Sequence, residues 1–355
     1  MPPVLNYPFP SRVHPDADLA EERMVDWLVR RQLLPPAAAD AFHTARFGEF
    51  AAREYPYADS EFLQFVTDLY GWLFVVDDQL CDESASGADP AGLARRLTPL
   101  TAVLDDPATA LHHPSARTDP LAAAFGDLCG RLTARATPTQ YARFAAGVRG
   151  YFHALLWEAG NRASRTVPTV HDYVTMRAHT SGSFGAQALI DVATGLPLGD
   201  AFDHPDVRRI ARITANLNSW SNDVLSHARE RSATHAVVHS LPGVLAHHLA
   251  LTPEQAIAEA ARRHDEEMER YLELEATLAR DATPAMAAFL EGLRCLMQGF
   301  YDWALRTPRY ATTPPESTPG ADGGQGGDAE SGTRASQQPQ ETSPSTVDPT
   351  ARLAG

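Results

Sequence analysis

The chain has 355 residues, of which 44% are hydrophobic, enough to bury one large core or two modest ones. Its 45 Asp and Glu exceed its 30 Lys and Arg, and the formal net charge of −15 excludes nucleic-acid binding through a basic surface. Only three cysteines are present, without a Cys-x-x-Cys pair, which argues against a disulfide framework or a thiolate zinc site.

The N-terminal segment, residues 1–12, is expected to be an extended arm. It lacks the basic stretch followed by an apolar stretch that marks a signal peptide. No run of about 18 apolar residues occurs that would span a bilayer. We therefore expect a soluble, cytoplasmic protein without stable membrane insertion. An acidic chain can still bind an anionic substrate if metal ions bridge the two.

Residues 13–310 have a helical pattern almost throughout, which predicts one all-α domain. Helix starts are marked by Thr-Pro and Asp-Pro pairs, and Thr137 and Thr252 also have Gln three residues later, the capping-box spacing. Alternating β-branched runs bounded by tight-turn residues are absent. We expect helices near residues 18–33, 37–54, 60–82, 89–104, 120–135, 138–163, 169–194, 205–230, 236–249, 253–280 and 284–306.

The predicted helix over residues 60–82 is apolar on most of its circumference, which places it in the middle of a bundle. It ends in the acidic run Asp77-Asp78-Gln79-Leu80-Cys81-Asp82-Glu83. Asp78 and Asp82 lie one helical turn apart, and Asp77 lies about 100° from Asp78 around the axis. Carboxylates are unfavourable at the negative end of a helix dipole, so this run indicates a compensating cation. The alternative is a solvated helix end.

A second polar constellation lies in the predicted helix over residues 205–230. Asn222, Ser226 and Glu230 occur at i, i+4 and i+8 and so share one helical stripe. They offer an amide, a hydroxyl and a carboxylate oxygen, hard ligands that suit Mg²⁺ rather than zinc. Spacing alone is equally consistent with the polar face of a surface helix.

The last segment, residues 311–355, is rich in Pro, Gly, Ser, Thr and Gln and nearly free of bulky apolar residues. Such a segment cannot bury enough surface to offset the entropy lost on ordering. We therefore expect a disordered tail.

Four motifs in the same order resemble those of the bacterial class I terpene synthases, also called terpene cyclases, over about residues 8–310. The aspartate-rich motif is matched by residues 77–82, and the Asn-Asp-x-x-Ser-x-x-(Lys/Arg)-Glu motif by residues 222–230. The string from Arg177 to Gly182 matches the region of the diphosphate-sensing arginine, and Arg309-Tyr310 matches the family's Arg-Tyr pair. The acidic motif has three intervening residues rather than two, and Arg177 lies one position later than the family spacing.

The resemblance implies a helical bundle with a central active-site cavity, in which a linear prenyl diphosphate ionises and the allylic cation cyclises. It implies three Mg²⁺ ions, with ligands from Asp77, Asp78, Asp82, Asn222, Ser226 and Glu230. The diphosphate would be bound by Arg177, Arg229, Arg309 and Tyr310. A helix break beside the sensor arginine would comprise Thr180, Ser181 and Gly182. The apolar cavity would exclude water and stabilise the cation with the aromatic faces of Phe74, Phe184 and Trp303.

Several alternatives remain open at this level. Farnesyl diphosphate is the expected substrate on family frequency, with geranylgeranyl diphosphate, and so a diterpene synthase, second. Chain-elongating prenyl synthases use two aspartate-rich motifs, whereas the second site here is Asn, Ser and Glu. From a different class, the chain would be a catalytically silent helical binding protein. The oligomeric state is left open, with a homodimer as one arrangement.

Overall fold

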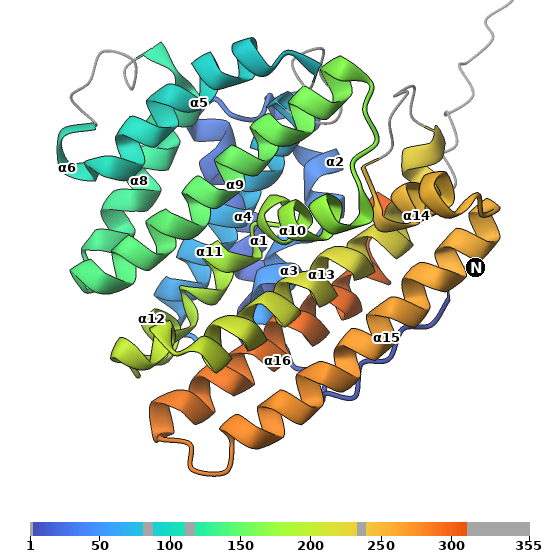
Figure 1. Ribbon diagram of the computed structural model, residues 1–355. Coiled ribbons are helices and arrows are strands. Elements are labelled where there is room, and N and C mark those ends of the chain that lie inside the picture. Colours follow the sequence, from blue (N-terminus) through green and yellow to red (C-terminus); the bar gives the residue numbers. More distant parts are fainter. Residues whose placement is uncertain (1–2, 81–87, 111–117, 233–238, 311–355) are drawn as a thin grey trace, which may run out of the picture. The chain divides into compact units, whose positions relative to one another are not determined.

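The computed structural model describes residues 3–80, 88–110, 118–232 and 239–310, and the tail expected over residues 311–355 lies outside them. The helical part falls within one compact unit, Met1–Thr313. Every regular element among the described residues is a helix, which confirms the predicted all-α fold (Figure 1). No helix in these ranges is both long and apolar enough to cross a bilayer. The elements are α1 (Ala17–Arg30), η1 (Pro36–Ala38), α2 (Ala39–Thr44), α3 (Phe47–Glu54), α4 (Ser60–Leu80), α5 (Pro90–Asp105), α6 (Pro107–Ala110), α8 (Pro120–Thr133), α9 (Pro138–Ser164), α10 (Val170–Thr180), α11 (Ser183–Gln187), α12 (Ile190–Thr194), η3 (Gly199–Asp203), α13 (Pro205–Ser232), α14 (Leu241–Leu249), α15 (Pro253–Leu278), α16 (Pro284–Ala304) and η4 (Pro308–Tyr310).

The predicted helix starts are confirmed by their caps. Thr137 and Thr252 both form complete capping boxes, in which the threonine hydroxyl accepts from the Gln backbone N–H and the Gln side chain accepts from the threonine N–H. Thr283 and Asp119 also accept a backbone N–H in the first turn of the helices that they precede. The side-chain oxygens thus satisfy donors that the helix itself leaves unpaired.

Two segments that the sequence predicted as continuous helices are interrupted. The expected helix over residues 37–54 is divided into η1, α2 and α3. The break between α2 and α3 lies at Arg46, whose left-handed φ of 60° interrupts the helical hydrogen-bond ladder. The expected helix over residues 169–194 is divided into α10, α11 and α12. The division between α10 and α11 falls at Gly182, which has a φ of 69°, within the break at Thr180, Ser181 and Gly182 that the family resemblance implied. The expected helix over residues 236–249 begins at Leu241 as α14, and residues 236–238 lie outside the described ranges.

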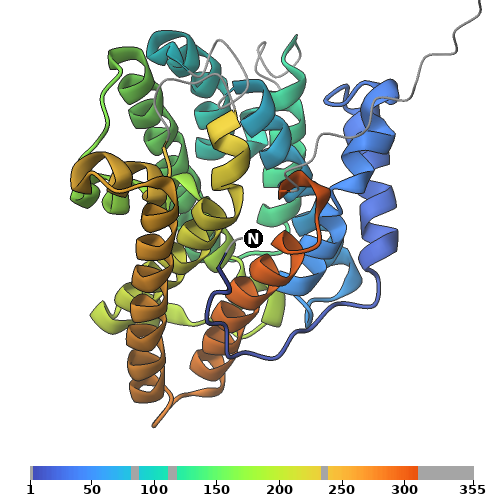
Figure 2. The same ribbon diagram turned by 90° about the vertical axis from the view of Figure 1, so that its right-hand side faces the viewer.

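The core is centred on α4, which packs against α1, α3 and α8. Most of its apolar side chains are buried, as the all-round apolar pattern predicted, and Trp72 stacks on Phe125 of α8 at 4.4 Å between ring centroids. On the other side, α13 packs against α10, α15 and α16. The two views show α4, α9, α13 and α16 arranged around the centre of the bundle (Figures 1 and 2).

The described part of the N-terminal arm, residues 3–12, contains no helix and runs across α15 and α16 (Figure 2). Its backbone is held by side chains of these helices: Leu5 N donates to Tyr301 Oη at 3.1 Å, and Asn6 N donates to Asp265 Oδ1 at 3.0 Å. The ring of Tyr7 stacks on Tyr301 at 4.5 Å.

Direct contact between helix backbones brings α3 against α16. A Cβ atom at Gly299 would lie 2.7 Å from the carbonyl carbon of Arg53 and 2.9 Å from the backbone nitrogen of Glu54. A contact this short would require backbone movement, so only glycine fits. The close approach puts the end of α3 and Phe300 of α16 side by side at the centre of the bundle.

Substitution of Gly299 tests this contact. Gly299→Ala should lower the free energy of unfolding by about 1–3 kcal/mol, because the added methyl group overpacks α3 against α16. The matched control is Gly130→Ala in α8, where a Cβ would meet no atom within 4 Å. There the lower backbone entropy of alanine should raise stability by about 0.5–1 kcal/mol. Urea unfolding measures both; equal effects of the two changes would contradict the packing argument.

A buried carboxyl group lies between α1 and α3. Glu21 has no exposed surface, and its Oε2 accepts a hydrogen bond from the backbone N–H of Gly48. Burial raises the pKa of Glu21 to about 7, although the Gly48 N–H and the charge of Arg46 partly offset the effect. The folded state therefore binds a proton that the unfolded state releases near its ordinary pKa of 4.5. Stability must fall as the pH rises from about 4.5 to about 7 and then level off.

Removal of this carboxyl group tests the sign of the effect. Glu21→Gln should raise the free energy of unfolding at pH 8, by at most about 3 kcal/mol, and the gain should shrink as the pH falls from 7 to 5. Glu22→Gln is the control, because Glu22 is the exposed neighbour of Glu21 on the same helix. Denaturant unfolding of wild type and both variants at pH 5, 6, 7 and 8 gives the comparison. A gain at pH 8 that persists unchanged at pH 5 would rule out the titration of Glu21.

Candidate active site

A cavity of about 370 Å³ lies at the centre of the bundle. Along α4 it is lined by Leu69, Leu73 and Asp77 at successive turns, so its wall changes from apolar to polar along the helix. The apolar part of the wall is mostly aromatic and contains Phe50, Tyr70, Trp72, Phe74, Phe125, Phe144, Tyr151 and Phe300. The polar end contains Asp77, Glu158, Arg162, Arg177, Asn222 and Tyr310.

The two aspartates at the end of α4 have different surroundings. Asp77 lines the cavity, whereas Asp78 does not and instead accepts a hydrogen bond from Nη2 of Arg309 at 2.9 Å. The same nitrogen lies 3.7 Å from Asp77 Oδ2. Burial disfavours the charge of Arg309, but Asp78 and Asp77 outweigh it and raise the pKa of the guanidinium above its usual range. Asp82 lies outside the described residues.

The polar stripe of α13 faces the same end of the cavity. Asn222 lines the cavity; its Nδ2 donates to Tyr310 Oη at 2.8 Å and its Oδ1 accepts from Nη2 of Arg177 at 2.8 Å. Ser226, one turn further on, is 2% exposed and donates to the backbone oxygen of Asn222 at 2.7 Å. The side chains of Arg229 and Glu230 lie outside the described part of the chain.

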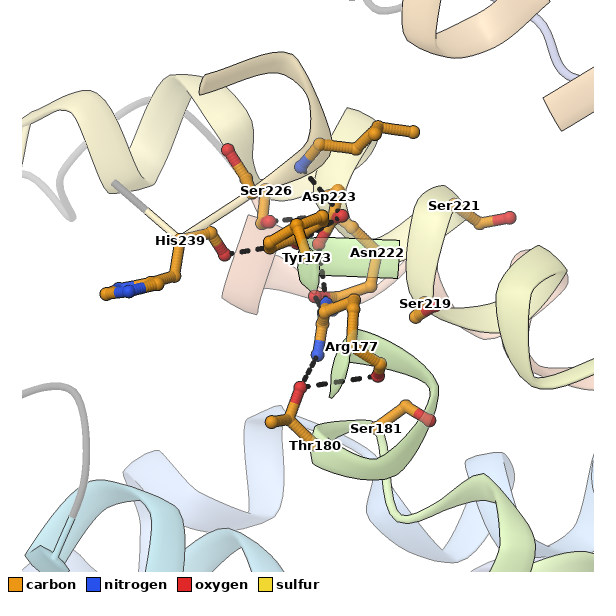
Figure 3. A network of polar contacts seen from close by, with 12 residues as sticks. Tyr173, Arg177, Thr180, Ser181, Ser219, Ser221, Asn222, Asp223, Ser226 and His239 are labelled. Atoms are coloured by element: carbon orange, nitrogen blue, oxygen red, sulfur yellow. Dashed lines mark hydrogen bonds and ion pairs between the residues drawn. The ribbon is translucent and has the colours of Figure 1, made fainter. Parts of the chain in front are cut away.

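Arg177 is held by a buried carboxylate, shown in Figure 3. Its Nε donates to Oδ1 of Asp223 at 2.9 Å, and its Nη1 donates to Thr180 Oγ1 at 3.0 Å. Asp223 is 1% exposed, and its Oδ2 also accepts from Tyr173 Oη at 2.7 Å and from the backbone N–H of Leu241 at 2.9 Å. Asp223 is not among the site residues expected from the sequence. A signal was present, because Asp223 is the second residue of the Asn-Asp-x-x-Ser motif over residues 222–230.

The helix that carries Arg177 is interrupted shortly after it: α10 ends at Thr180 and α11 begins at Ser183. Thr180, Ser181 and Gly182 all line the cavity. The break is held against α9 by a second backbone contact: a Cβ at Gly147 would lie 2.7 Å from Gly185 N. Glycine at position 147 is therefore required for α11 to approach α9 this closely.

The expected aromatic residues separate into two groups. Phe74 lines the cavity and has the guanidinium of Arg309 4.9 Å from its ring centroid. Phe184 and Trp303 do not line it, and this corrects the expectation from the sequence. Phe184 packs against His179, and Trp303 lies behind Phe50 with its Nε1 donating to the oxygen of Ala45 at 2.8 Å. Residue type alone does not specify which side of a buried helix faces the cavity.

The oxygen atoms at the polar end fit a hard divalent cation. Asp77 is 35% exposed. Asp77 and Asp78 both face the guanidinium of Arg309, so two carboxylates share one arginine there. With Asn222 and Ser226, Asp77 offers carboxylate, amide and hydroxyl oxygens, the ligand types of Mg²⁺. Within the described ranges no group of three His, Cys, Asp or Glu residues surrounds a common point. The set named here is of a different kind, since it includes an Asn and a Ser.

Comparison with known proteins agrees with this geometry. Residues 68–270 match the family described as terpene synthase family 2, C-terminal metal binding. A 4-epi-cubebol synthase of Streptosporangium roseum is 31% identical over 310 residues, covering 87% of this chain and 92% of the relative. A (+)-T-muurolol synthase of Roseiflexus castenholzii is 32% identical over 314 residues, covering 87% and 94%. The crystal structure of the ancestrally reconstructed SVS_A2 protein superposes with a TM-score of 0.78 at 26% identity, covering 90% of this chain and 96% of that one.

These matches and the fold show that the chain belongs to the terpene synthase family and is an enzyme of that class, as the motifs predicted.

The diphosphate-binding role that the family resemblance predicts for Arg177 is tested by substitution. Arg177→Ala should lower diphosphate release from a prenyl diphosphate by about 100-fold or more, because a preorganised cation at the leaving group is lost. Arg177→Lys keeps a charge beside Asp223 but not the planar fork, and should also be strongly impaired. Arg212→Ala removes an exposed arginine of α13 outside the cavity and should leave the rate unchanged. Circular dichroism verifies folding, and near-normal turnover of the alanine variant would exclude the assigned role.

Proposed function

We propose that the protein ionises a linear prenyl diphosphate, with farnesyl diphosphate as the principal substrate, and cyclises the allylic cation to a cyclic terpene. One observation carries this proposal: Asp77 of α4 and Asn222 of α13 line the polar end of a cavity whose remaining wall is largely aromatic. Both relatives described above are named as enzymes that cyclise (2E,6E)-farnesyl diphosphate. Geranylgeranyl diphosphate is the second candidate substrate.

The diphosphate would be bound at the polar end by Arg177, Arg309 and Tyr310. The guanidinium forks of the two arginines match phosphate oxygens, and the phenol of Tyr310 adds one donor. Each group is oriented before substrate enters: Arg177 by Asp223, Arg309 by Asp78, and Tyr310 by Asn222. Side chains that are already oriented need little reorganisation when charge develops on the leaving group.

Asp77, Asn222, Ser226 and Glu230 would hold Mg²⁺, with Asp82 as a further ligand and three ions as the proposed number. When bound, Mg²⁺ supplies the charge that neutralises the leaving diphosphate. In this arrangement Asp78 keeps Arg309 in place rather than binding metal, since Oδ1 of Asp78 already accepts a hydrogen bond of 2.9 Å from Nη2 of Arg309.

The apolar wall would guide the carbocation after ionisation. Phe50, Trp72, Phe74 and Phe300 exclude water from the hydrocarbon, and their ring faces stabilise positive charge through the ring quadrupole. Phe50 is held by stacking on Trp303 at 4.5 Å, so the buried tryptophan acts through the orientation of its neighbour.

Incubation with substrate tests the activity and its metal together. Reaction with Mg²⁺ and farnesyl diphosphate should give a cyclic terpene in the organic extract and free diphosphate, and an excess of EDTA should abolish both. Parallel reactions with geranyl and geranylgeranyl diphosphate establish the chain-length preference. Asp77→Asn should require more Mg²⁺ for the half-maximal rate, because one charged ligand is lost. If none of the three substrates gave a hydrocarbon or terpene alcohol, the chain would instead be a catalytically silent helical binding protein.

A further inference from the structure

The described part of the N-terminal arm presents alternate side chains to the bundle. Leu5 is buried and Tyr7 and Phe9 are half-buried, whereas the residues between them are exposed. This alternation is that of an extended chain, in which successive side chains point to opposite sides. Phe9 meets the ring of Tyr271 on α15 edge to face, at 5.8 Å between centroids. The arm therefore directs the side chain of Tyr7 inward, toward the helices beneath it.

Tyr7 contacts three helices. Its ring stacks on Tyr301 of α16 at 4.5 Å and lies 5.1 Å from the imidazole ring of His264 on α15. His264 has no exposed surface, and its Nε2 lies 3.1 Å from Tyr7 Oη. The hydroxyl also meets α13, where it donates to the backbone oxygen of Leu217 at 3.3 Å and is hydrogen-bonded to Oγ of Ser221. One side chain of the arm thus joins α13 to α15 and α16.

The contact on α13 adjoins the residues that line the cavity. Ser221 directly precedes Asn222, Leu217 directly precedes Asn218, and both asparagines line the cavity. Ser221 has no exposed surface, and its Oγ donates to the backbone oxygen of Leu217, one turn earlier, at 2.7 Å. Figure 3 shows the side chain of Ser221 directed away from Asn222 and Arg177. Tyr7 therefore bonds from outside to the same turn that carries Asn222 on its cavity side.

Other contacts attach the arm without involving α13. Leu5 N donates to Tyr301 Oη on α16 at 3.1 Å, and Asn6 N donates to Asp265 Oδ1 on α15 at 3.0 Å. Among the described residues of the arm, Tyr7 alone is hydrogen-bonded to α13. Attachment of the arm thus has anchors of its own, and the hydroxyl of Tyr7 makes a separate connection.

This turn of α13 depends on contacts behind it. A turn that faces a cavity has no packing atoms on that side, so its position is determined by the neighbours that remain. The requirement is strict at Asn222, because the groups of a binding site must be held within about 0.5 Å of the productive geometry by their supporting residues. The bonds from Tyr7 to Leu217 and Ser221 lie where such support is needed.

We propose that Tyr7 is a positioning residue for the metal site: its hydroxyl fixes the turn of α13 from Leu217 to Ser221, and so holds Asn222 in place for binding Mg²⁺. The inference rests on the proposed terpene cyclase function and adds to it a role for the N-terminal arm. The coupling is reciprocal. Because the attached arm favours the position of α13 that binds metal, Mg²⁺ and diphosphate in turn favour attachment of the arm.

The test compares single hydroxyl deletions. Tyr7→Phe removes the hydroxyl and keeps the ring that stacks on Tyr301, and Ser221→Ala removes the partner on α13. Tyr301→Phe is the matched control, because it removes the acceptor of Leu5 N but leaves Tyr7 joined to α13. Isothermal titration calorimetry measures binding of Mg²⁺ in the presence of inorganic diphosphate, and urea unfolding measures stability. Diphosphate release from farnesyl diphosphate is followed over a range of Mg²⁺ concentrations.

Tyr7→Phe should weaken Mg²⁺ binding about fivefold, the effect of losing one hydrogen bond, and should raise the Mg²⁺ concentration for the half-maximal rate by the same factor. At saturating Mg²⁺ the rate should return to within about threefold of wild type, since the metal ligands are intact. Ser221→Ala should resemble Tyr7→Phe, and the double variant should bind Mg²⁺ within about twofold of either, because both changes remove the same bond. Tyr301→Phe should bind Mg²⁺ as wild type does.

Two results would overturn the proposal. If Tyr7→Phe lowered stability but left Mg²⁺ binding unchanged, Tyr7 would serve only to attach the arm. If Tyr301→Phe weakened Mg²⁺ binding as much as Tyr7→Phe, attachment of the arm in general would be responsible, rather than the contact with α13.

Hydrogen exchange tests the reciprocal effect without turnover. The amides of Leu5 and Asn6 should exchange about fivefold more slowly when Mg²⁺ and inorganic diphosphate are added to wild type, and this protection should be absent in Tyr7→Phe. Unchanged exchange in wild type would overturn the proposal, even with full cyclase activity. Absence of diphosphate release from wild type with all three prenyl diphosphates would instead overturn the proposed function.

Discussion

The buried ion pair between Asp223 and Arg177 is the interaction on which the polar end of the cavity depends. Asp223 is almost fully removed from water and holds groups from α10, α13 and the start of α14 through hydrogen bonds to Arg177, Tyr173 and Leu241. A buried charge is tolerated only when paired and hydrogen-bonded, so these partners are nearly obligatory. Because Arg177 also binds Asn222, which binds Tyr310, one carboxylate orients the residues proposed to bind diphosphate and metal.

The cavity separates charge along its length, and this separation explains how the two halves of the proposed reaction coexist. At one end carboxylates, arginines and amide oxygens stabilise a highly charged leaving group. At the other end aromatic rings enclose a space suited to a hydrocarbon cation.

Much of this arrangement was predictable because it depends on local chemistry. The capping boxes at Thr137 and Thr252 use residues three positions apart, and the apolar circumference of α4 is a property of one helix. The break at Arg46 was not predicted, because apolar residues continue on both sides of it. The break near Gly182 was implied by the family resemblance and not by periodicity. Phe184 and Trp303 were expected in the cavity for their aromatic rings, yet both point into neighbouring packing.

The sequence alone determined the all-α class, the family and the residues of the motifs, since each is recorded in residue type and in spacing over a few helical turns. Only the tertiary structure decided which of these residues meet. The pairing of Asp78 with Arg309 joins positions 231 residues apart, and the hydrogen bond from Tyr55 Oη to the carbonyl oxygen of Ala186 joins positions 131 residues apart. Contacts of this kind depend on how closely helices approach, and that distance is set by glycines such as Gly147 and Gly299, whose partners in space no local pattern reveals.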